Sequence, residues 1–210
     1  MKKIVLLLVL LLFALTLSTQ SLEEDRLIQK QIEIAIHSNQ KAVFYSSRLR
    51  ESDAMTYEVA RERVEAIHYA SEKFNYLYPE ISPRRVAKDL FAIIDLETRF
   101  VNYSFESGVL DRGRSGGFIS MLESTAREIA QKNNWSYERT SFIGDPKTQL
   151  SYMAFLYYEN LRFFNDRMKA ILAYNRGING TNPNEIRWEE YYFKVLGRII
   201  YFDRLYQEGI

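Results

Sequence analysis

Glu97 follows three apolar residues at the spacing of one helix face. Val86, Leu90, Ile93 and Glu97 follow one another at i, i+4, i+7 and i+11, which places all four on one face of a helix. Because the first three are apolar, this face looks into the core, and the carboxyl of Glu97 is expected at the core wall. Removal from water favours the neutral, proton-bearing form of a carboxyl group. Such a glutamate is the general acid that cleavage of a glycosidic bond requires.

Spacing alone leaves another interpretation of Glu97 open, and favours it. A glutamate near a helix end can turn to solvent or form an ion pair, here with Arg99 or Arg84. Perturbed carboxylates are common in structural ion pairs as well as in active sites. Further residues are therefore needed to assign chemistry to Glu97.

Two later clusters carry glycines and hydrogen-bonding side chains. Residues 108–126 contain four glycines, so this segment is expected to turn tightly or to let a ligand approach its backbone. No Gly-Lys-Ser/Thr follows, which excludes a phosphate loop. Residues 173–177 read Ala-Tyr-Asn-Arg-Gly at a helix end, where the Tyr and Asn could hydrogen-bond a sugar. A surface loop and an ordinary helix terminator are the alternative interpretations.

The order and intervals of these features resemble the catalytic domain of the soluble lytic transglycosylases, which shares its fold with goose-type lysozyme. The family pattern is Glu-Ser-x-Phe at a helix end, then a glycine loop reading Gly-Ala-x-Gly-Leu-Met-Gln-Leu-Met-Pro-x-Thr-Ala. An Asp-Pro that opens a helix follows, and finally Ala-Tyr-Asn-x-Gly. These motifs correspond to residues 97–100, 114–126, 145–146 and 173–177, and the resemblance covers about residues 83–205.

The resemblance implies an all-α, lysozyme-like (SLT) helical domain and a peptidoglycan lytic transglycosylase. Glu97 would be the single catalytic acid and base. It would protonate the glycosidic oxygen between N-acetylmuramic acid and N-acetylglucosamine, while the substrate's acetamido oxygen stabilises the developing charge. It would then accept the C6 hydroxyl proton as that oxygen closes onto C1, which gives a 1,6-anhydro end. A second catalytic carboxylate is not required in such substrate-assisted chemistry.

The resemblance also implies a set of substrate-binding residues, no metal and no cofactor. His37 and His68 lie far apart in the sequence, and neither belongs to a group of residues with the spacing of metal ligands. The glycan strands of peptidoglycan are the expected partner. The residues expected to contact the substrate are Thr98, Gly117, Ser120, Leu122, Tyr174 and Asn175.

The chain departs from the family pattern at several positions. Ile119 and Leu122 replace two methionines, an apolar exchange that should preserve shape, and Thr98 replaces serine but keeps a hydroxyl. Ser120 replaces the glutamine, which removes an amide able to donate and to accept hydrogen bonds. Glu123 replaces the proline, and we interpret it as a solvated charge at a helix N-terminus, with a second catalytic group as the alternative.

Two alternative functions remain open. The first is a muramidase that hydrolyses the same bond with water. The second is a non-catalytic peptidoglycan-binding protein of the envelope, indicated by the loss of the glutamine at Ser120.

Residues 1–21 have the three-part pattern of a secretory signal peptide. Two lysines follow Met1, residues 4–15 are apolar, and a small, mostly polar segment comes next. The apolar segment is short for a membrane span, so we expect export to the periplasm or cell envelope. An uncleaved anchor is the main alternative, and only then would the protein contact the membrane. The absence of cysteine excludes a lipoprotein anchor and disulfides.

The remaining chain is expected to form one all-α unit. Residues 22–80 are interpreted as a charge-rich helical extension packed on a catalytic domain of residues 81–210. Three roles stay open for this extension: it could narrow the cleft, dock an envelope protein, or only complete the core. Without Lys2 and Lys3 the 28 basic residues become 26, against 27 acidic ones, so no concentrated basic surface for nucleic acid is expected.

Local signals predict several helix boundaries. Ser21 and Glu24 have capping-box spacing and predict a helix start, with an apolar face at Leu27, Ile28, Gln31, Ile32 and Ala35. A second face is predicted at Ala60, Val64, Ile67, Ser71, Phe74 and Tyr78. Ser82-Pro83 and Asp145-Pro146 predict two further starts. Helices are also expected over 167–175, ending at Gly177, and over 191–206. Trp135 and Trp188 are expected in the core rather than against a sugar.

Overall fold

The computed structural model describes residues 2–47, 49–105, 114–177 and 188–208. For residues 2–21, 52, 188–189 and 206–208 it describes the backbone alone. The protein is 77% helical, which confirms the all-α class, and one short antiparallel hairpin is its only sheet among the described residues. The helices are α1 (Lys2–Tyr45), α2 (Tyr57–Lys73), α3 (Pro83–Glu97), α4 (Glu123–Asn133), α5 (Arg139–Gly144), α6 (Pro146–Phe164), α7 (Arg167–Arg176) and α8 (Trp188–Glu208). The strands are β1 (Ser115–Gly116) and β2 (Met121–Leu122), and 3-10 turns occupy Glu51–Asp53 and Asn75–Leu77.

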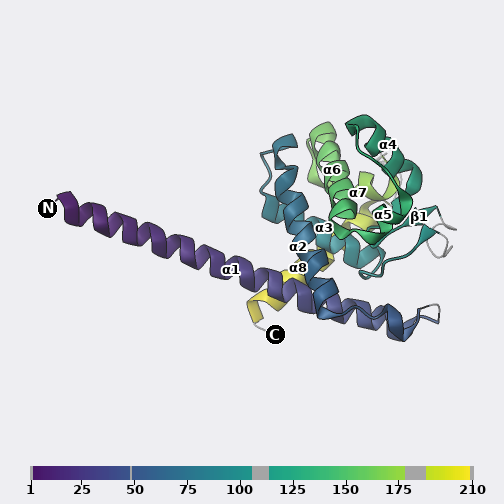
Figure 1. The fold of residues 1–210 in the computed structure, drawn as a ribbon, viewed down its shortest axis with the longest axis horizontal. Coiled ribbons are helices and arrows are strands. Elements are labelled where there is room, and N and C mark those ends of the chain that lie inside the picture. The colour runs from purple at the N-terminus through teal and green to yellow at the C-terminus, as the bar shows by residue number, and fades with distance from the viewer. Residues whose placement is uncertain (1, 48, 106–113, 178–187, 209–210) are drawn as a thin grey trace.

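Helix α1 runs through Ser21 without a break, so the helix start predicted there is wrong. Leucine and alanine favour helix on the N-terminal side, and no glycine or proline interrupts residues 16–26. The capping-box spacing at Ser21 therefore occurs inside a helix. The N-terminal part of α1 extends beyond the body of helices (Figure 1). The predicted apolar face is confirmed further along, where Ile32 and Ala35 are buried.

The predicted signal peptide or anchor, residues 1–21, forms the start of α1 from Lys2 onward, and its side chains lie outside the described residues. Among the residues whose side chains are described, no helix is long and apolar enough to cross a membrane. The apolar segment 4–15 lies outside these residues.

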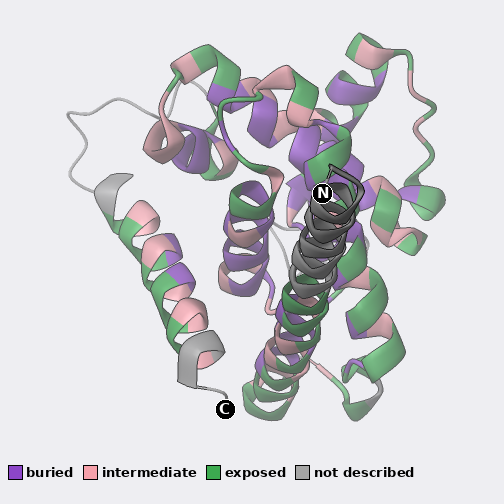
Figure 2. Cartoon of the chain, turned by 90° about the vertical axis from the view of Figure 1, so that its left-hand side faces the viewer, coloured by how far each residue is buried: buried purple, intermediate pink, exposed green. Residues whose placement is uncertain are grey.

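Helix α2 lies inside the body of the protein, against α6, α3 and α1 (Figure 1). Its predicted apolar face is confirmed, since Ala60, Val64 and Ile67 are fully buried and Phe74 is buried just beyond its end. One continuous cluster of buried side chains extends from α1 to α8, so the core passes across residue 80 without interruption. Figure 2 shows these buried residues on the inward faces of the helices, with exposed residues on the outer face of α1.

The predicted starts of α3 and α6 are confirmed by their caps. The Ser82 hydroxyl accepts a hydrogen bond from the backbone N–H of Arg85, and Pro83 occupies the first helical position. The Asp145 carboxylate likewise accepts from two backbone N–H groups at 3.1 Å before Pro146. A side chain at the N-cap satisfies donors that the first helical turn leaves free, so these local sequences define where the helices begin.

A buried charge network fixes the position of α3 against α6 and α7. Asp89 on α3 is fully buried and accepts hydrogen bonds from Tyr157 Oη on α6 at 2.7 Å and Arg167 Nε on α7 at 2.8 Å. The hydrogen bond to Asp89 raises the pKa of the Arg167 guanidinium above its ordinary value. Because an unpaired buried carboxylate would be costly, this pairing restricts how α3, and Glu97 at its end, can lie.

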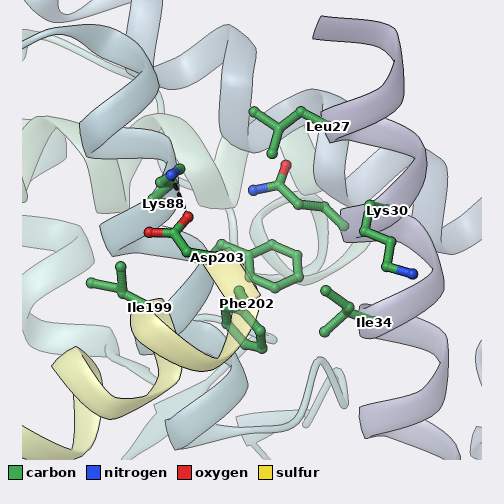
Figure 3. A pocket seen from close by; sticks show the side chains of 9 residues that line it. Leu27, Lys30, Ile34, Lys88, Ile199, Phe202 and Asp203 are labelled. Carbon is green, nitrogen blue, oxygen red and sulfur yellow. Dashed lines mark hydrogen bonds and ion pairs between the residues drawn. The ribbon is translucent and has the colours of Figure 1, made fainter. Parts of the chain in front are cut away.

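Helices α1, α3 and α8 meet along a narrow apolar seam. Leu27 and Ile34 line it from α1 and Phe202 lines it from α8, beside an ion pair between Lys88 and Asp203 (Figure 3). The space left at this seam is about 20 Å³, which is room for a single water molecule. We therefore interpret the seam as helix packing.

Candidate active site

A cleft of about 670 Å³ lies where the end of α3 meets the hairpin, α4, α6 and α7. Glu97 lines it from the end of α3, and Ser120 and Leu122 line it from the hairpin. Tyr174 and Asn175 line it from the last turns of α7. Five of the residues predicted from the sequence to act on or bind the substrate therefore share one cleft, although up to 78 residues separate them in the chain.

The carboxyl group of Glu97 is held by two hydrogen bonds. Tyr191 Oη on α8 donates to Glu97 Oε1 at 2.6 Å, and Asn175 Nδ2 donates to the same oxygen at 2.9 Å. Among the described residues, Glu97 forms no ion pair with Arg99 or Arg84, so that interpretation is wrong. Arg99 pairs with the buried Asp95 at 3.6 Å, and Arg84 lies about 20 Å further back along α3, given the helical rise per residue.

Two tyrosines beside Glu97 remain hydrogen-bond donors over a wide pH range. Burial, and the Glu97 carboxylate next to it, raise the pKa of Tyr191 well above its ordinary value. The same two causes, burial first, raise the pKa of Tyr174. Both hydroxyls therefore keep their protons, and Tyr191 can keep donating to Glu97.

The hairpin that forms one wall of the cleft is fixed by side chains from α6, from α7 and from the residue that follows α3. Thr98 Oγ1 donates to the Phe118 carbonyl at 2.5 Å, and Tyr174 Oη donates to the Ile119 carbonyl at 2.7 Å. From α6, Gln149 Oε1 accepts from the Phe118 backbone N–H at 2.9 Å. The strands pair Ser115 with Leu122 and Gly116 with Met121, so the segment predicted as a glycine loop is a short hairpin in its described part.

Gly117 is required by its backbone and by its neighbour. Its φ is +75°, in the left-handed region that favours glycine. A Cβ at this position would lie 2.1 Å from Gln149 Oε1, which is closer than any non-bonded contact allows. The close approach lets Gln149 reach the Phe118 N–H, so the hairpin lies directly on α6.

Thr98 and Gly117, both predicted to contact the substrate, are buried behind the cleft wall. Neither lines the cleft, and both hold the hairpin in place. Ser120 does line the cleft and has a φ of +54°, a conformation that is uncommon for a residue other than glycine. Leu122 presents an apolar side chain to the cleft and is 39% exposed.

The chain leaves α3 through two successive residues with positive φ, Arg99 at 52° and Phe100 at 60°. The Phe100 ring is fully buried, with its centroid 4.9 Å from that of Phe91, and Arg63 donates a hydrogen bond to the Phe100 carbonyl. Such strained positions persist only where their surroundings hold them, and they cluster at functional sites. Here they end α3 directly after Glu97.

Glu123 belongs to an ion-pair cluster outside the cleft lining. It begins α4, where a negative charge is favourable, and it pairs with Arg127 at 2.7 Å and with Arg139. Hydrogen bonds from Arg139 and Arg127 lower the pKa of its carboxyl group, so Glu123 is ionised at neutral pH. Its place at the start of α4 agrees with the interpretation of Glu123 as a helix N-terminal charge, but the side chain is 17% exposed and paired with two arginines, not solvated.

Several residues of the site were not predicted from the sequence. Among them, Tyr191 on α8 donates a hydrogen bond to Glu97, and Glu128 and Asn160 line the cleft from α4 and α6. A signal existed only for Tyr191, which precedes the buried Val195 and Ile199 at helical spacing and so belongs to the inward face of α8.

The tryptophans and histidines have no described role in the cleft. Trp135 packs on Phe74, Tyr152 and Phe155 with ring centroids 5.1 to 5.8 Å apart, which confirms its predicted place in the core. The side chain of Trp188 lies outside the described residues. Within the described part of the chain, no group of three or more potential ligands could hold a metal ion.

Comparison of the chain with protein-family models, with curated proteins and with solved structures finds no match.

Proposed function

We propose that the protein is a peptidoglycan lytic transglycosylase with a lysozyme-like helical fold. One observation carries this proposal. Three motifs that are far apart in the sequence, at Glu97, at 115–122 and at 173–177, meet at one cleft, with the Glu97 carboxyl group held at its wall. These are three of the four motifs on which the resemblance to the lytic transglycosylases rests. The proposed reaction cleaves the N-acetylmuramic acid–N-acetylglucosamine bond and leaves a 1,6-anhydro end.

In the proposed mechanism, the hydrogen bonds to Glu97 separate the roles of its two oxygens. Tyr191 and Asn175 both donate to Oε1, so the proton of the neutral acid is carried by Oε2 and transferred to the glycosidic oxygen. The two donors then stabilise the carboxylate that results. Glu97 next accepts the C6 hydroxyl proton as the anhydro ring closes, which returns it to the neutral acid.

The remaining predicted residues take distinct roles in this proposal. Tyr174 and Thr98 hold the carbonyls of the hairpin, and Gly117 allows the hairpin to lie on α6, so we assign these three residues to positioning. Ser120 and Leu122 face the ligand. Leu122 offers an apolar surface to a sugar ring, while Ser120 offers one hydroxyl where the family has a glutamine amide.

The proposed location is the periplasm or cell envelope, and it rests on the signal-peptide pattern of residues 1–21. No metal or cofactor enters the proposed mechanism, because a single carboxyl group and the substrate's own acetamido group provide the chemistry. Residues 22–80 supply α2 and part of α1 to the core, and the outer surface of this segment remains available for an envelope partner.

The experiment that tests the function is digestion of purified sacculi, followed by mass spectrometry of the released muropeptides. The proposal predicts fragments with anhydro ends, lighter by one water than the hydrolysed product. Fragments with ordinary reducing ends would identify a muramidase instead. Binding to sacculi without any released fragment would identify a non-catalytic peptidoglycan-binding protein.

A further inference from the structure

Asn160 is a buried amide with an unused donor. It lies on α6 with 2% of its surface exposed, and its Nδ2 has no hydrogen-bond partner in the structure. The neighbouring Tyr157 and Leu161 are buried core residues. A buried N–H group without a partner destabilises the folded protein, and a leucine would fill this position without that cost. The described part of the folded chain therefore provides no hydrogen-bond acceptor for the Asn160 amide N–H group, and a bound ligand could provide one.

Asn160 lies at the cleft that contains Glu97, where a ligand could supply that partner. Leu156 lines the same cleft four residues earlier, so the two side chains lie on one face of α6. On α4, Thr125 and Glu128 line the cleft and are three residues apart, which again places them on one helix face. We name these four residues the α4–α6 wall.

An ion pair holds the two helices of this wall together. Lys132 Nζ on α4 lies 2.7 Å from Glu159 Oε2 on α6. Lys132 is one turn beyond Glu128, and Glu159 precedes Asn160 directly. Asn160 and Glu128 therefore line the cleft from two helices that an ion pair joins next to them.

We propose that the α4–α6 wall binds an acetamido group of the glycan, at a position distinct from the Glu97 carboxyl group. An acetamido group has one acceptor, its carbonyl oxygen, and one donor, its N–H. Asn160 Nδ2 donates to the carbonyl oxygen, the Glu128 carboxylate accepts from the N–H, and Leu156 contacts the methyl group. The inference rests on the proposed function, because both sugars of a peptidoglycan strand carry this group.

Titration calorimetry with two saccharides tests the inference on the full-length protein. The parent carries Glu97→Gln to prevent turnover, and the ligands are the N-acetylglucosamine tetramer and the glucose tetramer, which lacks acetamido groups. Asn160→Leu and Asn160→Asp each remove the donor and are expected to weaken binding of the acetylated tetramer by roughly three- to tenfold. Their affinity for the glucose tetramer should stay that of the parent. Glu65→Gln, at an exposed carboxylate on α2, is the control and should change neither.

The stability of Asn160→Leu provides a second readout. Its thermal midpoint should equal or exceed that of the parent, because the variant removes a buried donor without a partner. Unchanged affinity for the acetylated tetramer in both Asn160 variants would overturn the inference. No binding of the tetramer by the parent, together with cleavage of sacculi by the wild type, would also overturn it and leave the proposed function standing. If binding depends on Asn160 but sacculi are not cleaved, the α4–α6 wall is supported as an acetamido-binding site and the proposed catalytic activity is contradicted.

Discussion

The hydroxyl of Tyr191 donates a 2.6 Å hydrogen bond to Oε1 of Glu97, and this contact joins the C-terminal helix to the end of α3. The two residues are 94 positions apart in the chain. Burial and the adjacent carboxylate raise the pKa of Tyr191, so its hydroxyl keeps its proton and continues to donate to Glu97. The helix α8 is therefore part of the site and not only a cover for the core.

Tyr191→Phe removes this hydrogen bond and keeps the ring. We expect kcat on sacculi to fall about tenfold, because the donor stabilises the carboxylate formed after the first proton transfer. The loss should appear in kcat more than in KM, since Tyr191 donates to Glu97 and does not line the cleft. Tyr192→Phe, at the next position of α8, is the matched control and should retain wild-type kcat. Equal losses in both variants would indicate a general effect of α8.

Glu123→Gln tests whether a second carboxylate takes part in the reaction. Glu123 is paired with Arg127 and Arg139 and does not line the cleft, so we expect activity within about twofold of wild type. Stability should fall by at most about 1 kcal/mol, because partly exposed ion pairs contribute little. Activity on sacculi and urea unfolding measure the two effects. A loss of activity comparable to that of Glu97→Gln would restore Glu123 as a catalytic group.

Gly117→Ala and Gly177→Ala separate backbone conformation from steric collision. Both glycines have positive φ, at +75° and +73°, but a Cβ meets Gln149 only at Gly117. Gly177→Ala should cost about 1–3 kcal/mol from its conformation. Gly117→Ala should cost about 2 kcal/mol more, because displacement of Gln149 leaves buried polar groups unpaired. Urea unfolding of the two variants gives the difference, and equal midpoints would show that the Gln149 contact contributes nothing.

Stability should depend on pH through His68. Burial, and to a smaller extent the nearby Arg84, lowers the pKa of His68 from 6.5 to about 4. The His68 ring forms a hydrogen bond with the side chain of Gln31. The unfolded chain binds this proton near pH 6.5 and the folded protein only near pH 4, so acid favours unfolding between these values. We expect a loss of about 1–2 kcal/mol from pH 7 to pH 5 in urea unfolding. His68→Gln should remove most of this loss, and an undiminished loss would contradict the assignment.

The sequence predicts those parts of the fold that local chemistry determines. Ser82-Pro83 and Asp145-Pro146 begin α3 and α6 as expected, because the cap, the proline and the first turn lie within four residues of one another. The spacing at Ser21 and Glu24 misleads, because the residues before it also favour helix and nothing ends that helix. The hairpin is not predictable in this way, because strands of two residues are too short to show alternation.

The site is predictable only to the extent that its residues occur in motifs. Glu97, Tyr174 and Asn175 were found by spacing and resemblance, and they do share a cleft. Tyr191 and Asn160 were not found, because their part in the site depends on how α8 and α6 pack. That packing is determined by distant contacts such as the Asp89 network, which no sequence interval reveals.

Glu97→Gln on purified sacculi is the most direct test of the central claim. The change keeps the size and polarity of the side chain, but the amide cannot donate and recover a proton. We predict that the release of anhydro-muropeptides falls at least about a hundredfold, while the variant still binds sacculi and keeps its thermal midpoint. Release of anhydro-muropeptides at the wild-type rate by Glu97→Gln would contradict the assignment of Glu97 as the catalytic acid and base.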